Sequence, residues 1–464
     1  MRCDLALLAG LALASCTTPQ AATRDVAGLT VARSGVEAPR RDPGRMDELH
    51  PAVAERLREP LDADGAVSIA LRQSPELQAR LAQVDLAVAE LWSARPPNPE
   101  VEMEALMDGG QASVLEVGAV MDIGALLRMP LMRRAAQAQL DSAELEAAAD
   151  VLRYAYDTRV AFHRYQADLQ LVELYRAAME TFLAAWEAAE SMAEAGNLRQ
   201  LDVAQNRAAY ERSRIDVAQA ELRALMSREQ LQVLLGLDGR QTDWAVIDGF
   251  EAPGGGEPPP APALERTAVD HSLVLNAQQR TLVAWSRRVG VERMRGALPE
   301  AHAGLFAERE EGEWSFGPAA GVAIPVFDQN QGAIGETRAR LRIAQHELLQ
   351  KAIRIRSLAR RARATWLNAA ERVRFYDETL LPARAEVLEQ TLLQYNAMNV
   401  GVFQLLQARR AVIDAARERV EAMFDLWRAS AQVELVVAGG EPPAMGGPDM
   451  SGEAMNAGGG DGGH

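Results

Sequence analysis

The side chains of this chain that could do chemistry are few and widely spaced. Six histidines occur in 464 residues, and no two of them stand four residues apart. The two cysteines, Cys3 and Cys16, lie near the start and form no CxxC pair. Zinc sites need closely spaced ligands of this kind, and the chain also lacks the nucleophile-elbow, P-loop and dinucleotide-binding motifs. We therefore expect no enzyme, no metal centre and no cofactor.

Cys16 has a different chemistry, because it closes a short apolar leader, "LLAGLALASC". The run from Leu5 to Leu13 is too short to span a bilayer, which takes about 20 apolar residues, yet it fits the central part of a signal peptide. Residues 13–16 resemble the lipobox of bacterial lipoproteins, whose cysteine is acylated and becomes the first residue of the mature chain. We expect a signal peptide and lipidation at Cys16. A signal peptide cut nearby, with Cys16 incidental, is the alternative.

Carboxylates recur at a spacing that predicts a β-strand near residues 100–107. Glu100, Glu102 and Glu104 alternate with apolar residues, so an extended chain carries all three on one face. Carboxylates that line a water-filled path favour cations. A second strand near residues 113–123 has an apolar face of its own. That face consists of Leu115, Val117, Ala119 and Met121.

The second half of the chain repeats this pattern, with strands near residues 300–309 and 313–325. An apolar face opposite small or polar residues is typical of a membrane β-barrel strand, and also of any half-exposed antiparallel sheet. The pattern leaves both interpretations open. If the strands cross a membrane, several copies must share one barrel, because the smallest single-chain barrels use about eight strands. The last strand has an apolar face of Trp314, Phe316, Pro318, Ala320, Val322 and Ile324.

Long helices are expected over most of the remaining chain. Apolar residues recur at gaps of three and four over residues 171–185 and 341–373. Residues 133–195 contain no Pro and no Gly, and as one helix they would form a rod of roughly 90 Å. Two adjacent apolar flanks favour a helix packed between two neighbours, as in a curved wall of helices. A dimeric coiled coil is the alternative.

The two halves of the chain are alike. "ALRQSPELQARLAQV" (70–84) resembles "AVDHSLVLNAQQRTL" (268–282), and "LDVAQNR" (201–207) lines up with "FQLLQAR" (403–409). The offset is about 200 residues, far more than the 20–50 residues of a solenoid repeat. The matches therefore indicate that a whole structural unit is duplicated.

These observations divide the chain into six segments. The Gly- and Pro-rich linker is expected to form neither helix nor strand. His464 with Met445, Asp449 and Met450 could catch soft metal ions in the tail, but the Gly-rich composition favours a solubilising, disordered end. The segments are a signal peptide (1–15), a lipid-anchored N-terminal arm (16–60), a first structural repeat (64–249), the linker (250–263), a second repeat (264–438) and the tail (439–464).

The helical pattern breaks once in each half, which predicts two helix–turn–helix tips. Gly and Asn at the breaks tolerate turn conformations. Apolar residues beside the breaks could anchor a partner or pack against each other. Glu194 and Asp202 would form carboxylate rings if several copies surround an axis. The tip residues are Gly196, Asn197, Leu198, Leu201, Val400, Gly401, Val402 and Phe403.

The stretch "IPVFDQNQG" (324–332) marks the change from strand to helix in the second half. Pro325 suits a strand end because proline cannot donate a hydrogen bond to the ladder. Asp328 could cap the following helix by accepting from free amide groups. We interpret the motif, which also contains Phe327, Gln331 and Gly332, as a structural corner.

With these residues together, the chain resembles the TolC-like outer-membrane efflux proteins over about residues 64–437. The "IPVFDQNQG" stretch is similar to the strand-to-helix junction of family members paired with heavy-metal efflux pumps. "AGNLRQLDVAQ" (195–205) and "VGVFQLLQARR" (400–410) are similar to the two helical tips of the family. The first-half counterpart of the junction, "DIG" (122–124), departs from the family pattern because it lacks the proline.

The resemblance implies a mainly α fold with a small membrane β-barrel: a long α-helical coiled-coil barrel plus four β-strands per protomer, internally duplicated and trimeric. It implies a lipid-anchored location in the outer membrane, with helices extending into the periplasm. The implied partners are two further copies of the chain, a periplasmic adaptor (membrane fusion) protein at the tips, an inner-membrane efflux pump and outer-membrane lipid.

The function implied is that of a passive exit duct in a tripartite efflux system, with metal cations as the cargo class that the junction motif indicates. A lipid-anchored periplasmic scaffold without a pore is one alternative, and an exit duct for type I secretion is another. The formal net charge of −16 argues against nucleic acid as a partner, which would favour basic surfaces.

Overall fold

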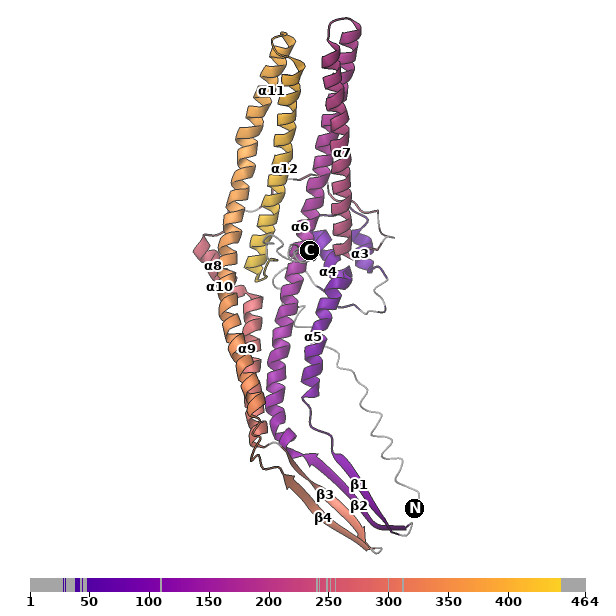
Figure 1. Cartoon of the computed structure of the whole chain (residues 1–464), viewed down its shortest axis with the longest axis vertical. Coiled ribbons are helices and arrows are strands. Elements are labelled where there is room, and N and C mark those ends of the chain that lie inside the picture. Colours follow the sequence, from indigo (N-terminus) through magenta and orange to yellow (C-terminus); the bar gives the residue numbers. More distant parts are fainter. Residues whose placement is uncertain are drawn as a thin grey trace, which may run out of the picture.

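The chain forms two long, roughly parallel helical rods above a small tilted β-sheet (Figure 1). A computed structural model describes most of the sequence. The described residues are 28, 30, 38–41, 44, 48–108, 111–238, 241, 243–247, 249–250, 252–254, 256–298, 300–310 and 313–443. The signal peptide, Cys16 and most of the Gly-rich tail lie outside these residues.

The first half runs from short helices through two strands into a long helical hairpin. Ser74 separates the second and third helices, and its hydroxyl accepts from Leu77 N at the start of the third. The tip of the hairpin lies at the end of the molecule opposite the sheet (Figure 1). The elements are α3 (Pro51–Arg56), α4 (Ala63–Gln73), α5 (Pro75–Ser93), β1 (Glu100–Asp108), β2 (Gln111–Asp122), α6 (Ile123–Glu194) and α7 (Gln200–Leu235).

The second half repeats this order. Its long helix contains a π-helical turn, η2, which ends two residues before Pro382. A proline has no N–H to donate and its ring crowds the preceding turn, which disturbs regular helical hydrogen bonding there. The elements are α8 (Ala261–His271), α9 (Leu273–Ala297), β3 (Ala301–Glu310), β4 (Glu313–Val322), α10 (Gln331–Phe375), η2 (Tyr376–Leu380), α11 (Leu381–Asn396) and α12 (Val402–Ala438). The expected duplicated, mainly helical fold with four strands is confirmed.

The duplication extends to matching caps. Ser74 starts α5 in the first half, and Ser272 starts α9 by accepting from Leu275 N in the second. The last helix of each half ends at a glycine with positive φ, Gly236 at 68° and Gly439 at 94°. This left-handed residue is the ordinary way to end a helix, since glycine adopts it without a side-chain penalty.

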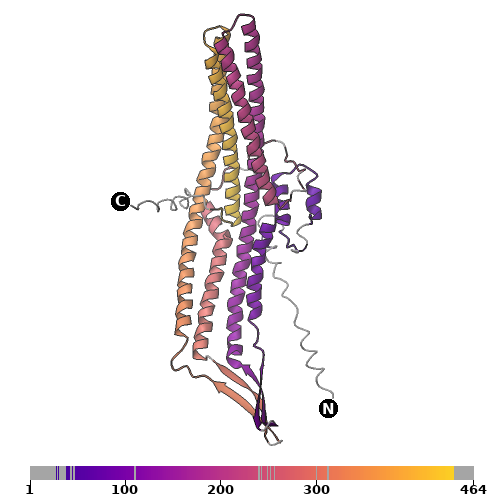
Figure 2. The ribbon, with the colours of Figure 1, turned by 45° about the vertical axis from the view of Figure 1, so that its right-hand side comes forward.

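The four strands form one antiparallel sheet in the order β1-β2-β3-β4. The pairing of β2 with β3 joins the two halves, from Val114 opposite Glu310 to Asp122 opposite His302. In the described part of the chain, β1 and β4 are edge strands. Figure 2 shows the sheet bending away from the foot of the helices.

α6 is the centre of the helical packing. Its Tyr154 and Phe162 are buried in the largest core cluster, with Leu71 of α4 and Leu231 of α7. Nearer the tips, Phe182 of α6 packs in a cluster with Leu406 of α12, which joins the two hairpins. The 72 residues of α6 span about 110 Å at 1.5 Å per residue.

Several boundaries differ from the sequence-based expectation. The N-terminal arm contains helix α3, because His50 caps it and Pro51 fits the first turn. Pro262 likewise fits the first turn of α8, so the linker ends at Pro260. α6 begins at Ile123 and continues through Pro130. β4 ends at Val322, which places Ile324 and Pro325 outside the strand.

Candidate functional site: sheet face, junctions and tips

One face of the sheet carries a row of carboxylates. Glu104 of β1 lies opposite Glu116 of β2, which lies opposite Glu308 of β3. Directly paired residues of antiparallel strands project to the same face, about 5 Å apart, and like charges there repel. No ion pair to these three groups occurs among the described residues. Water or bound cations around the three carboxylates would therefore reduce their mutual repulsion.

The predicted strand carboxylates belong to this face. Glu102 lies opposite Gly118 and Glu100 lies opposite Val120, so all three predicted glutamates are on the side of the acidic row. All three are exposed. Glu116 and Glu308 were missed as site residues, because the β2–β3 register joins positions about 190 residues apart and no local pattern reports it.

The opposite face of the sheet is apolar. Val101 and Met103 of β1 share it with Leu305 of β3 and Phe316 of β4, and all four side chains are exposed. Near the β3–β4 turn, the guanidinium of Arg309 lies 6.0 Å from the centre of the Trp314 ring. An aromatic and a cation together mark the end of the apolar band.

The first strand-to-helix junction is direct. β2 ends at Asp122 and α6 begins at the next residue. Asp122 Oδ1 accepts from Ala125 N at 2.7 Å, and Oδ2 lies 3.5 Å from the guanidinium of the buried Arg128. The carboxylate therefore caps α6 and also neutralises a buried charge.

The second junction takes eight residues, and the expected cap there is wrong. Asp328 Oδ1 accepts from Asn330 N at 2.8 Å, so it closes a turn before the helix. The residue preceding α10 is Asn330, at φ 63°, whose side-chain amide donates to the Glu292 carboxylate at 2.7 Å. Gln331 Nε2 donates to Phe327 O at 3.4 Å. These contacts fix the corner, with Pro325 and Gly332 at its two ends.

The two tips have the same backbone turn. Gly196 (φ 76°) and Met398 (φ 61°) each follow the end of a helix in the left-handed region. Asn197 N donates to Met192 O, and Asn399 N donates to Gln394 O, both at 2.9 Å. Gly401 has φ −87°, so the second turn uses the left-handed conformation at Met398 and not at the glycine.

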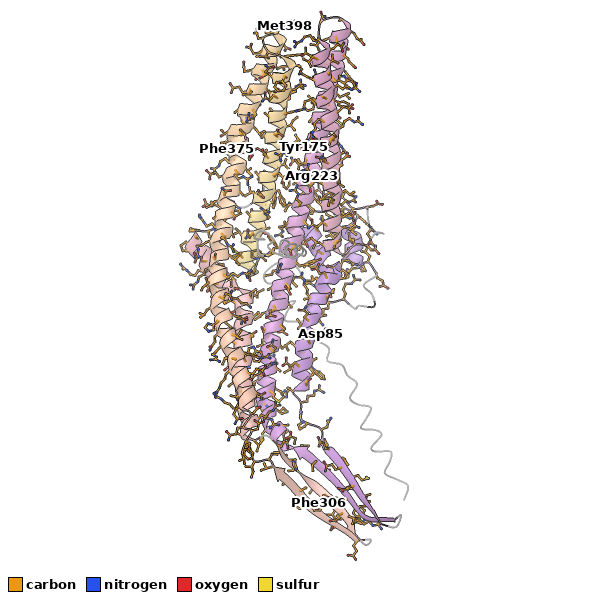
Figure 3. All side chains as sticks on the ribbon, in the orientation of Figure 1. Asp85, Tyr175, Arg223, Phe306, Phe375 and Met398 are labelled. Carbon is orange, nitrogen blue, oxygen red and sulfur yellow. The ribbon has the colours of Figure 1, made fainter. Side chains whose placement is uncertain are left out.

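The tip side chains separate into packed and exposed groups. Val402 is buried in a cluster with Phe182 of α6 and Leu406 of its own helix. Leu201 is 60% exposed and Phe403 is 63% exposed, which leaves both accessible to a partner. Met398 is 90% exposed at the same end of the molecule (Figure 3). Leu198 and Val400 are partly buried.

The two tip carboxylates differ. Asp202 is only 6% exposed and accepts from Arg199 Nε at 2.9 Å. The hydrogen bond to this carboxylate raises the pKa of Arg199. Glu194 is exposed at the end of α6. Asp202 is therefore neutralised within its own tip, and a ring of free carboxylates there would have to come from Glu194.

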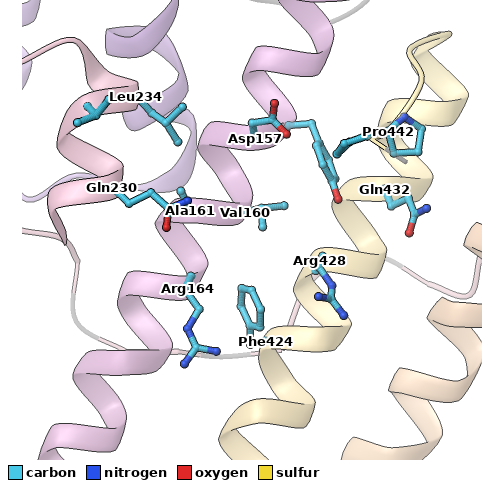
Figure 4. A pocket seen from close by; sticks show the side chains of 13 residues that line it. Asp157, Val160, Ala161, Arg164, Gln230, Leu234, Phe424, Arg428, Gln432 and Pro442 are labelled. Atoms are coloured by element: carbon cyan, nitrogen blue, oxygen red, sulfur yellow. The ribbon is translucent and has the colours of Figure 1, made fainter. Parts of the chain in front are cut away.

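A cavity of about 710 Å³ lies between α6, the end of α7 and α12 (Figure 4). Arg164 on its wall donates to Asp168 on the same helix and to Glu421 of α12 at 2.8 Å. Burial lowers the pKa of the nearby His163 to about 4, and its ring stacks on Trp427 at 3.8 Å. The half-buried ion pair between Arg164 and Glu421 and the stacked rings of His163 and Trp427 both join α6 to α12.

Within the described residues, no cluster of three or more His, Cys, Asp or Glu side chains could hold a metal ion. Across the same residues, no helix is long and apolar enough to cross a membrane. Cys16 lies outside the part of the chain that the structure describes, as do His464, Met445, Asp449 and Met450.

No protein-family model and no curated protein matches this chain. Solved structures do match. CusC superposes with a TM-score of 0.69 at 15% identity, over 85% of this chain and 96% of its own. The CmeC outer-membrane channel of Campylobacter jejuni superposes with a TM-score of 0.68 at 14% sequence identity, over 82% of this chain and 86% of its own. The open state of the MtrE outer-membrane channel of Neisseria gonorrhoeae superposes with a TM-score of 0.65 at 15% sequence identity, over 82% of this chain and 89% of its own.

Proposed function

Because the chain has the TolC-like fold of outer-membrane channels, we propose that it is the channel subunit of a tripartite efflux system. Three copies would place their sheets in one barrel in the outer membrane and their rods in a tunnel through the periplasm. A periplasmic adaptor and an inner-membrane pump would complete the path. The energy would come from the pump, so the duct itself needs no catalytic group.

The observation that carries this proposal is the two-faced, open-edged sheet. Four strands leave unpaired backbone groups along β1 and β4, and exposed edges of this length invite pairing with another chain. Pairing β4 of one copy with β1 of the next would turn every apolar face outward and every acidic face inward. Three copies would give twelve strands, above the roughly eight that a barrel needs.

The acidic face would then line the outer part of the conduit. Glu104, Glu116 and Glu308 of three copies would contribute nine carboxylates, in one row of three for each copy, and Glu100 and Glu102 would extend the acidic surface. Such a lining attracts cations and repels anions. This supports metal cations as a cargo class, together with the resemblance of the "IPVFDQNQG" junction to that of heavy-metal efflux members.

At the other end, the exposed apolar side chains of the tips support adaptor contact. Leu201 and Phe403 lie near the two turns and remain accessible, whereas their neighbour Val402 is buried. Exposed apolar side chains at the end of a rod are suited to a partner that covers them. Cys16, once acylated, would add a lipid anchor to the barrel.

Single-channel recording in planar bilayers tests the channel. The purified protein should conduct and should prefer cations. The triple variant E104Q/E116Q/E308Q should lower the cation-to-anion permeability ratio, and the charge-preserving triple variant E104D/E116D/E308D serves as the matched control. Protein that binds bilayers without conducting would instead indicate a lipid-anchored scaffold. Mass determination of Cys16 peptides checks acylation separately.

A further inference from the structure

The segment between β4 and α10 exposes an unusual amount of apolar surface. Ile324 is 78% exposed, Val326 is 66% exposed and Phe327 is 94% exposed. The segment joins the sheet to the foot of α10 (Figure 1). A soluble surface rarely carries three neighbouring side chains of this kind, so this surface calls for a covering partner.

The backbone of this segment is held in place. Ala323 N donates to Glu300 O at 2.9 Å, and the Asn330 side chain donates to Glu292 O at 3.0 Å. Gly296 of α9 lies so close that a Cβ there would be 2.2 Å from the Gln329 carbonyl oxygen. The three apolar side chains are therefore displayed by a fixed corner.

The exposed segment continues the apolar face of the sheet. On β4 that face runs from Trp314 through Phe316 to Val322, and the chain then proceeds directly to Ile324. Ten strand residues rise about 33 Å, or about 25 Å when tilted by roughly 40°, which equals the apolar height of an outer-membrane barrel. Trp314 marks one end of this band, and Phe327 follows the other end.

We propose that Phe327, with Ile324 and Val326, lies in the headgroup–acyl boundary of the periplasmic leaflet and fixes the depth of the barrel. Aromatic side chains are enriched at both membrane interfaces. The polar Asp328 and Gln329 follow at once, as expected where the chain leaves lipid. The partner is a phospholipid surface and not a second copy, because the apolar segment extends the face opposite the acidic row. This inference rests on the proposed membrane barrel.

Tryptophan scanning in proteoliposomes tests the inference. The full chain is reconstituted in phosphatidylethanolamine–phosphatidylglycerol with or without acyl-brominated lipid, and the fluorescence of the parent is subtracted. F316W is the sheet-face control, and F375W, 51% exposed in the middle of the rod, is the aqueous control. F327W should be quenched by bromines near the headgroup and less by bromines deep in the acyl chains. F375W should lose none.

The controls separate the two proposals. If F316W is quenched and F327W is not, the interfacial role is overturned while the membrane sheet stands. A blue-shifted but unquenched F327W also overturns the interfacial role, since a second copy would then cover the residue. If F316W itself is unquenched, the membrane barrel fails and the inference fails with it. If F327W does not reconstitute, quenching of V326W tests the same position, since Val326 is the adjacent exposed residue.

Discussion

The two strand-to-helix junctions show how a duplicated unit came to have two different corners. In the first half, β2 passes into α6 within one residue, and Asp122 caps the helix. In the second half, eight residues intervene, and the residue before α10 makes no side-chain cap. The first corner is a polar bracket around Arg128, and the second displays apolar side chains. The two corners have the same place in the repeated topology, but one is polar and the other exposes apolar side chains.

The long helices of the two halves also differ in their regularity. α6 is one uninterrupted helix of 72 residues, whereas its counterpart is divided by the π-helical turn at Tyr376–Leu380. The tips differ in detail too, since glycine supplies the left-handed residue in the first and methionine in the second. The halves are thus equivalent in topology and unequal in local strain.

The largest expected effect comes from comparing two glycines with positive φ, Gly236 and Gly196. A Cβ at Gly236, whose φ is 68°, would lie 2.7 Å from Ser74 Cα, whereas Gly196 at φ 76° has open space around it. G236A should lower the free energy of unfolding by about 3 kcal/mol or more, through strain and a backbone clash. G196A should cost about 1 kcal/mol. Thermal unfolding in detergent compares them, and equal losses would contradict the packing described around Ser74.

The contact between His163 and Trp427 predicts an acid-sensitive link between the two rods. Burial lowers the pKa of His163 from 6.5 to about 4, so the unfolded chain binds the proton more readily. Stability from this group is complete above pH 6.5 and falls as the pH drops towards 4, by about 2 kcal/mol between pH 7 and pH 5. Parallel denaturation curves isolate the effect, since H163Q should lose this part of the pH dependence. An unchanged slope in H163Q would reject it.

The two corner aspartates should respond unequally to truncation. D122A removes the cap of α6 and leaves Arg128 buried with less counter-charge, so we expect a loss of about 1–2 kcal/mol. D328A removes one hydrogen bond to Asn330 N at an exposed site, so a few tenths of a kcal/mol are expected. Chemical denaturation of both variants measures the difference. A larger loss in D328A would mean that the second corner, not the first, secures its helix.

The smallest expected effect comes from exchanging the left-handed residues of the two tips, glycine in the first and methionine in the second. M398G should stabilise the second turn by about 1 kcal/mol, because glycine adopts the left-handed region without strain. G196M should destabilise the first turn by a similar amount. Hydrogen exchange of the flanking amides reports each tip locally. If M398G exchanges faster than the parent, the exposed methionine contributes a contact that outweighs its strain.

Much of this architecture could be predicted from local patterns. Alternation placed Glu100 and Glu104 on one strand face, and the gaps of three and four located the rods. The acidic row was not predictable, since Glu116 and Glu308 meet through strand pairing between the halves. The sequence pattern places the cap of the second corner at Asp328, whereas Asn330 occupies the position before α10. Such choices depend on contacts such as that with Glu292, which no spacing reveals.

The unbroken course of α6 has a consequence for how the two ends of the molecule are connected. α6 is helical from Ile123 to Glu194, so its backbone connects the turn after Glu194 to Asp122 and the β2 ladder with no change of helix type. The opposite rod is interrupted at Tyr376–Leu380, where the winding departs from that of an α-helix. The two halves of each chain therefore connect the tips to the sheet through helices of different winding.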